Sequence, residues 1–145
     1  MTANFANILS KPAADIERPK PLPVGQYLAI VMGMPEMKEI GQKNTPCAEF
    51  KVRVLSAGDD VDKTALADAG GLENKTMTAR FFLTDDSMYR LKEFLVEHLG
   101  IEEGKRTIGQ LLSDAPNRQV YIQVAHRPSQ DGQQIYAEIK STSKV

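Results

Sequence analysis

Ala48-Glu49-Phe50-Lys51-Val52-Arg53-Val54 is the stretch that decides the fold. Apolar and charged residues alternate through it, which is the two-residue period of a β-strand with one buried side and one side in water. The pattern predicts a strand with Phe50, Val52 and Val54 directed inward and the charged residues directed outward. A β-sheet is therefore expected at the centre of the fold.

Four more strands are predicted around this one. Residues 25–34 are apolar and rich in β-forming residues, residues 75–84 and 118–127 alternate, and a final strand follows the hairpin turn Gln130-Asp131-Gly132-Gln133. Residues 35–46 contain glycine, asparagine and two prolines, which is typical of a loop. Residues of these strands are expected to face a core shared with Phe50, Val52 and Val54. They are Met77, Ala79, Phe81, Leu83, Val120, Ile122, Val124 and Ile135.

One helix is well marked between the third and fourth strands. Thr84-Asp85-Asp86 supplies a cap and acidic residues for the positive end of the helix dipole, and Gly100 followed by Ile101 predicts its end. The apolar stripe along this helix consists of Met88, Leu91, Phe94, Leu95 and Leu99. Asp62 is expected to cap a shorter helix through Ala69, and residues 107–112 are expected to form a further turn.

The order of these elements predicts a mainly β protein with a five-stranded, OB-fold-like barrel and a helix between strands three and four. Closure of the sheet removes unpaired edges, which favours the barrel over the alternative of a flat sheet covered by the helix. Residues 1–24 contain four prolines and are expected to be an extended N-terminal arm. The predicted division is an arm at 1–24 and an OB-fold-like domain at 25–145.

The usual arrangements of catalytic and metal-binding residues are missing from the sequence. There is no phosphate-binding glycine loop and no nucleophile motif, and Cys47 has no second cysteine beside it. His98 lies on the predicted helix and His126 ends a predicted strand, where structural roles are the ordinary explanation. The sequence therefore predicts a protein that is not an enzyme and needs no cofactor or metal. With one cysteine and no apolar run of about 20 residues, it is expected in the cytoplasm.

Positive charge is concentrated on the predicted strands. Basic residues outnumber acidic ones in segments 25–56, 75–84 and 118–145, and the reverse holds in segments 57–74 and 85–103. Lys51, Arg53, Arg80 and Phe82 are predicted on the outer side of the second and third strands. Single-stranded nucleic acids bind to such surfaces because bases stack on the ring and phosphates contact the cations. The alternative is that these charges only keep the surface soluble and that Phe82 packs under the helix.

Two predicted loops extend this candidate surface. Lys38 and Lys43 belong to the first loop, and Arg127 belongs to the second, which spans His126 to Gln133. Loops in these positions line the binding groove of OB-folds.

Several stretches resemble phage and prophage OB-fold proteins that bind single-stranded DNA. Similar features are the opening Arg18-Pro19-Lys20-Pro21-Leu22-Pro23-Val24-Gly25-Gln26-Tyr27, Phe82-Leu83-Thr84-Asp85 before the helix, Leu99-Gly100-Ile101, and His126-Arg127-Pro128-Ser129-Gln130-Asp131-Gly132. The similarity spans most of the chain from Arg18 onward, and its motifs mark turns and helix ends. In one respect the chain departs from it, because the C-terminus is Lys140-Ser141-Thr142-Ser143-Lys144-Val145 and not the acidic tail with which many such proteins recruit partners.

The resemblance implies sequence-tolerant binding of single-stranded DNA in phage replication or recombination, with replication or recombination proteins as partners, in the cytoplasm of the host cell. A structural or adaptor protein of a phage, which uses the barrel for protein contacts, is the alternative. A small enzyme that contributes mainly a scaffold is a weaker third reading.

Overall fold

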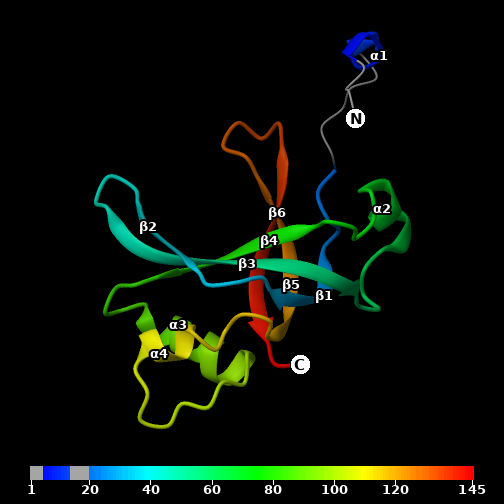
Figure 1. Cartoon of the computed structure of the whole chain (residues 1–145). Helices are drawn as coiled ribbons and strands as arrows, with labels where there is room; N and C mark the ends of the chain where they lie inside the picture. The colour runs from blue at the N-terminus through cyan, green and yellow to red at the C-terminus, as the bar shows by residue number, and fades with distance from the viewer. Residues whose placement is uncertain (1–4, 14–19) are drawn as a thin grey trace.

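The computed structural model describes residues 5–13 and 20–145. Within these residues six strands form one antiparallel sheet, in which β4 pairs with β3 and the remaining order is β2-β3-β1-β5-β6 (Figure 1). The strands are β1 (Gly25–Val31), β2 (Glu36–Ile40), β3 (Thr45–Ala57), β4 (Thr76–Phe82), β5 (Gln119–Pro128) and β6 (Ile135–Ser143). The prediction of a mainly β fold is confirmed.

The central strand is β3, which is 13 residues long and pairs with three other strands. Phe50, Val52 and Val54 are buried, whereas Lys51 and Arg53 are exposed, so the alternation predicted the two faces of this strand correctly. Because β3 is longer than the alternating stretch, it has room for β1 along its second half and for β2 along its first half.

The prediction of a loop over residues 35–46 is wrong. Residues 36–40 form β2, which turns at residues 41–44 and pairs with the start of β3. Gly41 and Asn44 adopt positive φ angles of 77° and 52° in this turn, as tight hairpins require. Every side chain of β2 is exposed or half-buried, so the strand has no apolar alternation from which the sequence could reveal it.

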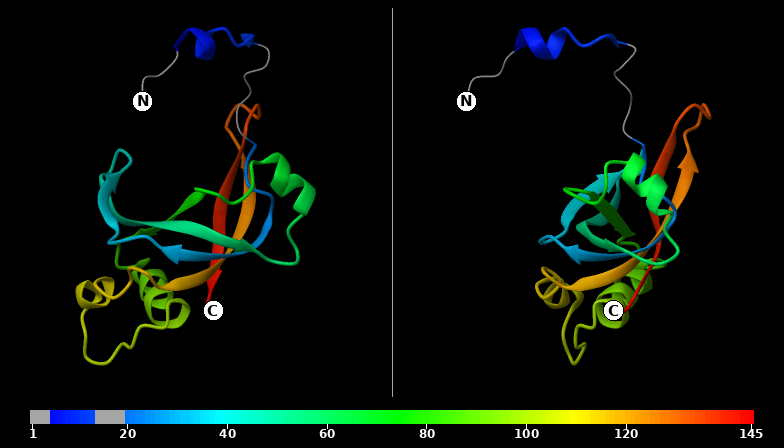
Figure 2. Two further views of the ribbon diagram at one scale, coloured as in Figure 1. Left: turned by 45° about the vertical axis from the view of Figure 1, so that its right-hand side comes forward. Right: turned by 90° about the vertical axis from the view of Figure 1, so that its right-hand side faces the viewer.

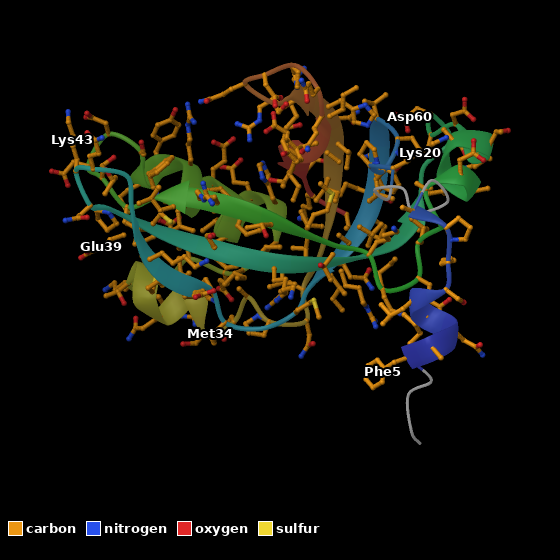
Figure 3. All side chains as sticks on the ribbon, turned by 90° about the horizontal axis from the view of Figure 1, so that it is seen from above. Phe5, Lys20, Met34, Glu39, Lys43 and Asp60 are labelled. Carbon is orange, nitrogen blue, oxygen red and sulfur yellow. The ribbon has the colours of Figure 1, made fainter. Side chains whose placement is uncertain are left out.

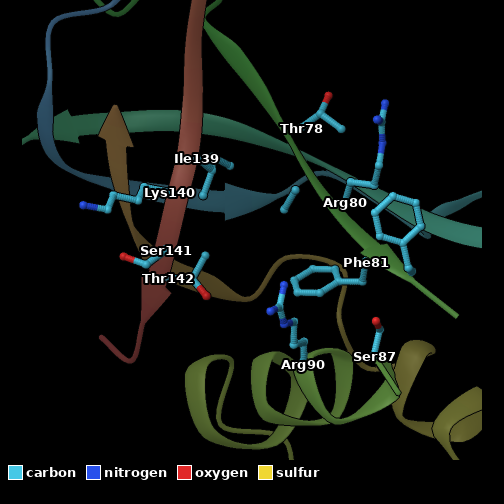
Figure 4. Close-up of a pocket in the computed structure, with 11 residues that line it drawn as sticks. Thr78, Arg80, Phe81, Ser87, Arg90, Ile139, Lys140, Ser141 and Thr142 are labelled. Carbon is cyan, nitrogen blue, oxygen red and sulfur yellow. The ribbon is translucent and has the colours of Figure 1, made fainter. Parts of the chain in front are cut away.

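The prediction of a closed barrel is not met either. The sheet has free edges at β4 and β6, which curl toward each other but share no strand pairing in the part of the chain that the structure describes (Figures 1 and 2). Figure 4 shows the side chains of Phe81 and Arg90 directed into the space between these two strands. Side chains from β4, β6 and α3 thus line the gap between the two edges.

The predicted helix lies between β4 and β5, as α3 (Met88–Glu93) continued by the wider π-turn η2 (Phe94–His98). Leu99 donates to the carbonyl of Phe94 at 2.8 Å, and Gly100 ends the helix with a φ of 74°. The expected end is therefore confirmed. The expected cap is not, because Ser87 occupies the N-cap and makes no side-chain cap hydrogen bond.

The helix packs on the inner side of the sheet through a cluster of three phenylalanines. Phe94 lies 5.1 Å from Phe50 and 4.8 Å from Phe81, measured between ring centroids. The predicted core is confirmed at the buried positions Met77, Ala79, Val120, Ile122 and Val124, and Phe81 and Leu83 are partly buried against it.

Ile135 was wrongly assigned to this core, since it is 55% exposed. It pairs with Pro128 at the far end of β5 and β6. This hairpin extends beyond the body of the molecule, where none of the described helices or other strands covers it (Figure 2).

Three short helices complete the described chain: α1 (Phe5–Leu9), α2 (Lys63–Asp68) and α4 (Ile108–Leu112). Asp62 caps α2 by accepting hydrogen bonds from the backbone of Thr64 and Ala65, as predicted. The turn predicted at 107–112 is α4, whose capping box pairs Thr107 with Gln110.

The predicted arm at 1–24 is described only in part, and its residues 1–4 and 14–19 lie outside the described residues. All the side chains of α1 are exposed. Leu22 and Pro23 are buried, and the Tyr27 hydroxyl donates a 2.7 Å hydrogen bond to the carbonyl of Pro23. The end of the predicted arm is therefore fixed to the sheet.

Candidate nucleic-acid interface

The outer face of β3 and β4 brings four of the seven predicted site residues onto two neighbouring strands. The antiparallel register places Lys51 opposite Thr78 and Arg53 opposite Thr76. It also places Arg80 opposite Glu49 and Phe82 opposite Cys47. The four predicted residues therefore share one surface, which we call the β3–β4 face.

Lys51 and Arg53 are the freely available cations of the β3–β4 face. Both are exposed, and neither has an ion-pair partner among the described residues. They lie two residues apart on one strand, so their side chains leave the same side of the sheet roughly 7 Å from each other. This arrangement can contact successive negative charges of an extended ligand.

Glu49 is a part of this face that the predicted site did not include. Its side chain is only 9% exposed, and its two oxygens lie 3.3 Å from Lys38 Nζ and 3.5 Å from an Arg80 terminal nitrogen. The hydrogen bond to Glu49 and the nearby charge of Glu36 raise the pKa of Lys38. Lys38 and Arg80 are therefore partly neutralised by a carboxylate, unlike Lys51 and Arg53.

Phe82 is the exposed aromatic residue of the face. Its side chain is 41% exposed, whereas Phe81 is turned inward against the rings of Phe50 and Phe94. The predicted register of β4 is thus confirmed, and Phe82 does not pack under the helix. Because Phe82 pairs with Cys47, it lies about 13 Å along the strands from Lys51.

Lys43 and Arg127 lie away from this cluster, in two projecting hairpins. Lys43 is in the turn between β2 and β3, at one end of the molecule, with Lys20 and Asp60 at the opposite end (Figure 3). Arg127 lies within β5, not in a loop, and its Nε is 3.4 Å from Glu138. Lys38 likewise belongs to strand β2. The structure therefore gathers the site on strands, and its loops contribute Lys43 alone among the seven predicted residues.

A cleft of about 290 Å³ adjoins the β3–β4 face, between β4, β6 and the start of α3 (Figure 4). Thr78, Arg80 and Phe82 belong to both the face and the cleft lining. Arg90 enters the cleft from the helix, and no acidic residue lines it among those described. We call it the β4–β6 cleft.

Arg90 was not among the predicted site residues. Its Nε donates a 3.1 Å hydrogen bond to the Tyr89 hydroxyl, and this bond raises the pKa of the guanidinium further. Its two terminal nitrogens make no hydrogen bond or ion pair with any described residue, and the guanidinium carbon lies 5.8 Å from the centroid of the Tyr89 ring. The sequence signal was weak: Arg90 is simply a polar position beside the apolar stripe of the helix.

The two histidines make contacts that join parts of the fold, and the cysteine is part of the protein interior. His98 Nδ1 lies 2.6 Å from the Thr142 hydroxyl and links the helix to β6. His126 Nε2 lies 2.7 Å from the carbonyl of Leu22 and holds the end of the arm, and Cys47 is buried. Within residues 5–13 and 20–145, no cluster of three or more potential metal ligands occurs. In the same residues no helix has the length and apolar character needed to cross a membrane.

The sequence matches no model of a known protein family, and no characterised protein is significantly similar to it.

Proposed function

We propose that this protein binds single-stranded DNA, with little sequence preference, across the β3–β4 face. The observation that carries the proposal is the joint exposure of Lys51, Arg53 and Phe82 on one surface. Unpaired cations attract phosphates, and an exposed ring offers a stacking platform that every base can use. The role that we propose for this binding is in phage replication or recombination, as a binding protein and not as an enzyme.

The strand arrangement supports an OB-fold-like assignment as part of this proposal. If β1 and β2 are two halves of one bent strand, since both pair with β3, the sheet has five strands in the order β4, β3, β1/β2, β5, β6. OB-folds are partly open five-stranded barrels that bind oligonucleotides on their second and third strands. The corresponding strands here are β3 and β4, which carry the proposed site.

A role as an adaptor between proteins is the second candidate. It is favoured by three exposed methionines near the link between β1 and β2, Met32, Met34 and Met37, each at least half exposed. Methionine side chains adapt to irregular partner surfaces. Under this alternative the chain binds protein through these residues, and the β3–β4 face is only a solvated surface.

Fluorescence anisotropy with a labelled oligo-dT at about 50 and 200 mM salt separates the two candidates. Wild-type protein is expected to bind at low salt and to lose affinity steeply as salt rises. Lys51→Ala and Arg53→Ala should each weaken binding and reduce the slope of log affinity against log salt by roughly 0.7. Each variant makes one phosphate contact fewer and therefore releases fewer counterions when it binds.

Lys105→Ala is the matched control, since Lys105 is an exposed lysine in the loop after the helix, far along the chain from β3 and β4. It should change neither the affinity nor the salt slope. Absence of wild-type binding at low salt would overturn the proposal and leave the adaptor role. Wild-type binding that Lys51→Ala and Arg53→Ala leave intact would exclude the β3–β4 face as its site.

A further inference from the structure

The β4–β6 cleft combines features of an anion site that the β3–β4 face does not have. It is a concave space between two strand edges and a helix, and the face is an open surface. Thr78, Ser87 and Thr142 contribute hydroxyl groups to its lining, and Arg80 and Arg90 contribute guanidinium groups. No described acidic residue lines the cleft, although Arg80 is shared with Glu49 beside it and the Thr142 hydroxyl is bonded to His98.

Arg90 is the best placed of these groups. Figure 4 shows its side chain rising from α3 into the cleft, beside the inward-facing Phe81. The hydrogen bond from Nε to Tyr89 fixes one side of the guanidinium and leaves both terminal nitrogens available. A planar guanidinium with two free nitrogens binds a phosphate through two parallel hydrogen bonds. Arg80, in contrast, is shared with Glu49.

The cleft is also continuous with the face. Arg80 and Phe82 line the cleft and at the same time stand on the outer side of β4. A strand of nucleic acid lying along β3 and β4 therefore reaches the cleft without crossing any intervening element. The edge of β4 is the point at which its path would turn inward.

We propose that the β4–β6 cleft is a phosphate subsite on the path of the single strand, in which Arg90 binds one backbone phosphate. The inference rests on the proposed binding of single-stranded DNA and extends it from a flat face to a path that bends round the edge of β4. The ligand chemistry that it requires is a phosphodiester, with the hydroxyl of Ser87 as an additional donor, since the Thr142 hydroxyl is already bonded to His98.

Lys140 provides a matched control for this proposal. It is an exposed lysine in β6 whose backbone borders the cleft, but its side chain points away from the cleft in Figure 4. Arg90→Ala and Lys140→Ala remove one positive charge each from the same region. If the DNA is attracted only by the overall positive charge of this region, both substitutions should lower its affinity equally. If a phosphate is bound in the cleft, only Arg90→Ala should lower the affinity.

The test measures the binding of labelled oligo-dT by full-length Arg90→Ala, Arg90→Lys and Lys140→Ala proteins over a range of salt concentrations. Arg90→Ala should lower the salt slope by roughly 0.7. Arg90→Lys should keep the slope and weaken binding several-fold, since the charge remains and the two-point geometry is lost. Lys140→Ala should keep the wild-type slope. An unchanged slope for Arg90→Ala, or equal losses for Arg90→Ala and Lys140→Ala, would overturn the subsite.

A second measurement does not depend on affinity. The Nε–H resonance of Arg90 in an NMR spectrum, assigned by its disappearance in Arg90→Lys, should move when oligo-dT is added, and it should stay fixed if the cleft is not used. The failures of the two proposals are distinguishable. Binding that depends on Lys51 and Arg53 but not on Arg90 would contradict only the proposed subsite. Binding that depends on Arg90 alone would contradict only the proposed role of the β3–β4 face. Absence of binding would contradict both proposals.

Discussion

Phe81 and Phe82 are adjacent residues with opposite surroundings, and the difference decides what each contributes. Phe81 packs against Phe50 and Phe94, whereas Phe82 is 41% exposed beside the β4–β6 cleft. An exposed ring costs solvation free energy that burial would recover, so its position on the cationic face fits a role in stacking.

Phe82→Ala is expected to weaken binding of oligo-dT by about 1–3 kcal/mol without a change in the salt slope, because stacking releases no counterions. Phe82→Tyr keeps a ring and should bind nearly as well as the wild type. Thermal unfolding monitored by circular dichroism verifies that both variants fold. A change of salt slope in Phe82→Ala would contradict stacking, and so would equal loss of affinity in both variants.

At the scale of residues, the sequence predicted which side of the sheet a side chain faces better than it predicted what surrounds that side chain. Strict alternation established which side of the sheet Lys51, Arg53, Arg80 and Phe82 occupy, since a strand has a period of two. The alternation also placed Glu49 on that side. The ion pair of Glu49 with Lys38 was not predicted, because Lys38 lies on β2, a strand that the sequence did not reveal. Charge neutralisation across strands is a property of the register, and a single alternating stretch contains no information about it.

At the scale of elements, the end of the helix was predicted well because one residue type is required there. Gly100 has a φ of 74°, a conformation in which a Cβ atom is strained, and it is followed by Ile101, which is buried. The start of the same helix was not predicted correctly. Thr84, Asp85 and Ser87 are all acceptable cap residues, so local chemistry alone does not choose among them.

Gly100→Ala should lower the free energy of unfolding by more than about 1 kcal/mol, because alanine is strained at this φ. Gly109→Ala is the matched control: Gly109 lies in α4 without a positive φ, and the nearest atom to an added Cβ is 3.9 Å away. The control should be neutral or stabilised by about 0.4–1 kcal/mol. Urea denaturation measures both, and equal effects of the two substitutions would show that backbone strain at Gly100 is not the cause.

On the scale of the whole molecule, the sequence predicted the strands but not how their ends meet. The central, alternating strands and the helix after β4 were expected from period and capping. The open gap between β4 and β6 was not expected, since it depends on how these two strands, far apart in the sequence, are placed in space. The β4–β6 cleft exists because the sheet stays open, and for that reason no local pattern predicted it.

Tyr27 connects the end of the arm to the sheet and makes the stability of the whole molecule sensitive to alkaline pH. Burial, with a smaller effect of the Asp60 charge, raises the pKa of Tyr27 from 10.0 to about 12. Because the folded protein holds this proton more tightly than the unfolded chain, the stabilisation is complete below about pH 10 and is lost as the pH rises toward 12.

Tyr27→Phe removes the 2.7 Å hydrogen bond to Pro23 and leaves a buried carbonyl without its donor. The variant should be less stable by about 1–3 kcal/mol at neutral pH. The gap between wild type and variant should narrow from pH 10 to pH 12, as the wild type alone loses the contribution of the tyrosine proton. Urea denaturation at several pH values measures this gap, and a constant gap would contradict the shifted pKa.

The pairing of β1 with β5 also determines when the protein can fold during synthesis. Gly25–Val31 lies near the beginning of the sheet-forming chain, and its partner Gln119–Pro128 lies near the end. On the ribosome, β1 can meet β3 early, but its other edge stays unpaired until β5 has emerged. Closing so long a loop is slow compared with forming a local hairpin. The nascent chain therefore keeps one edge of this apolar strand unpaired until residues 119–128 have emerged, and the complete sheet forms only after β6 has left the exit tunnel.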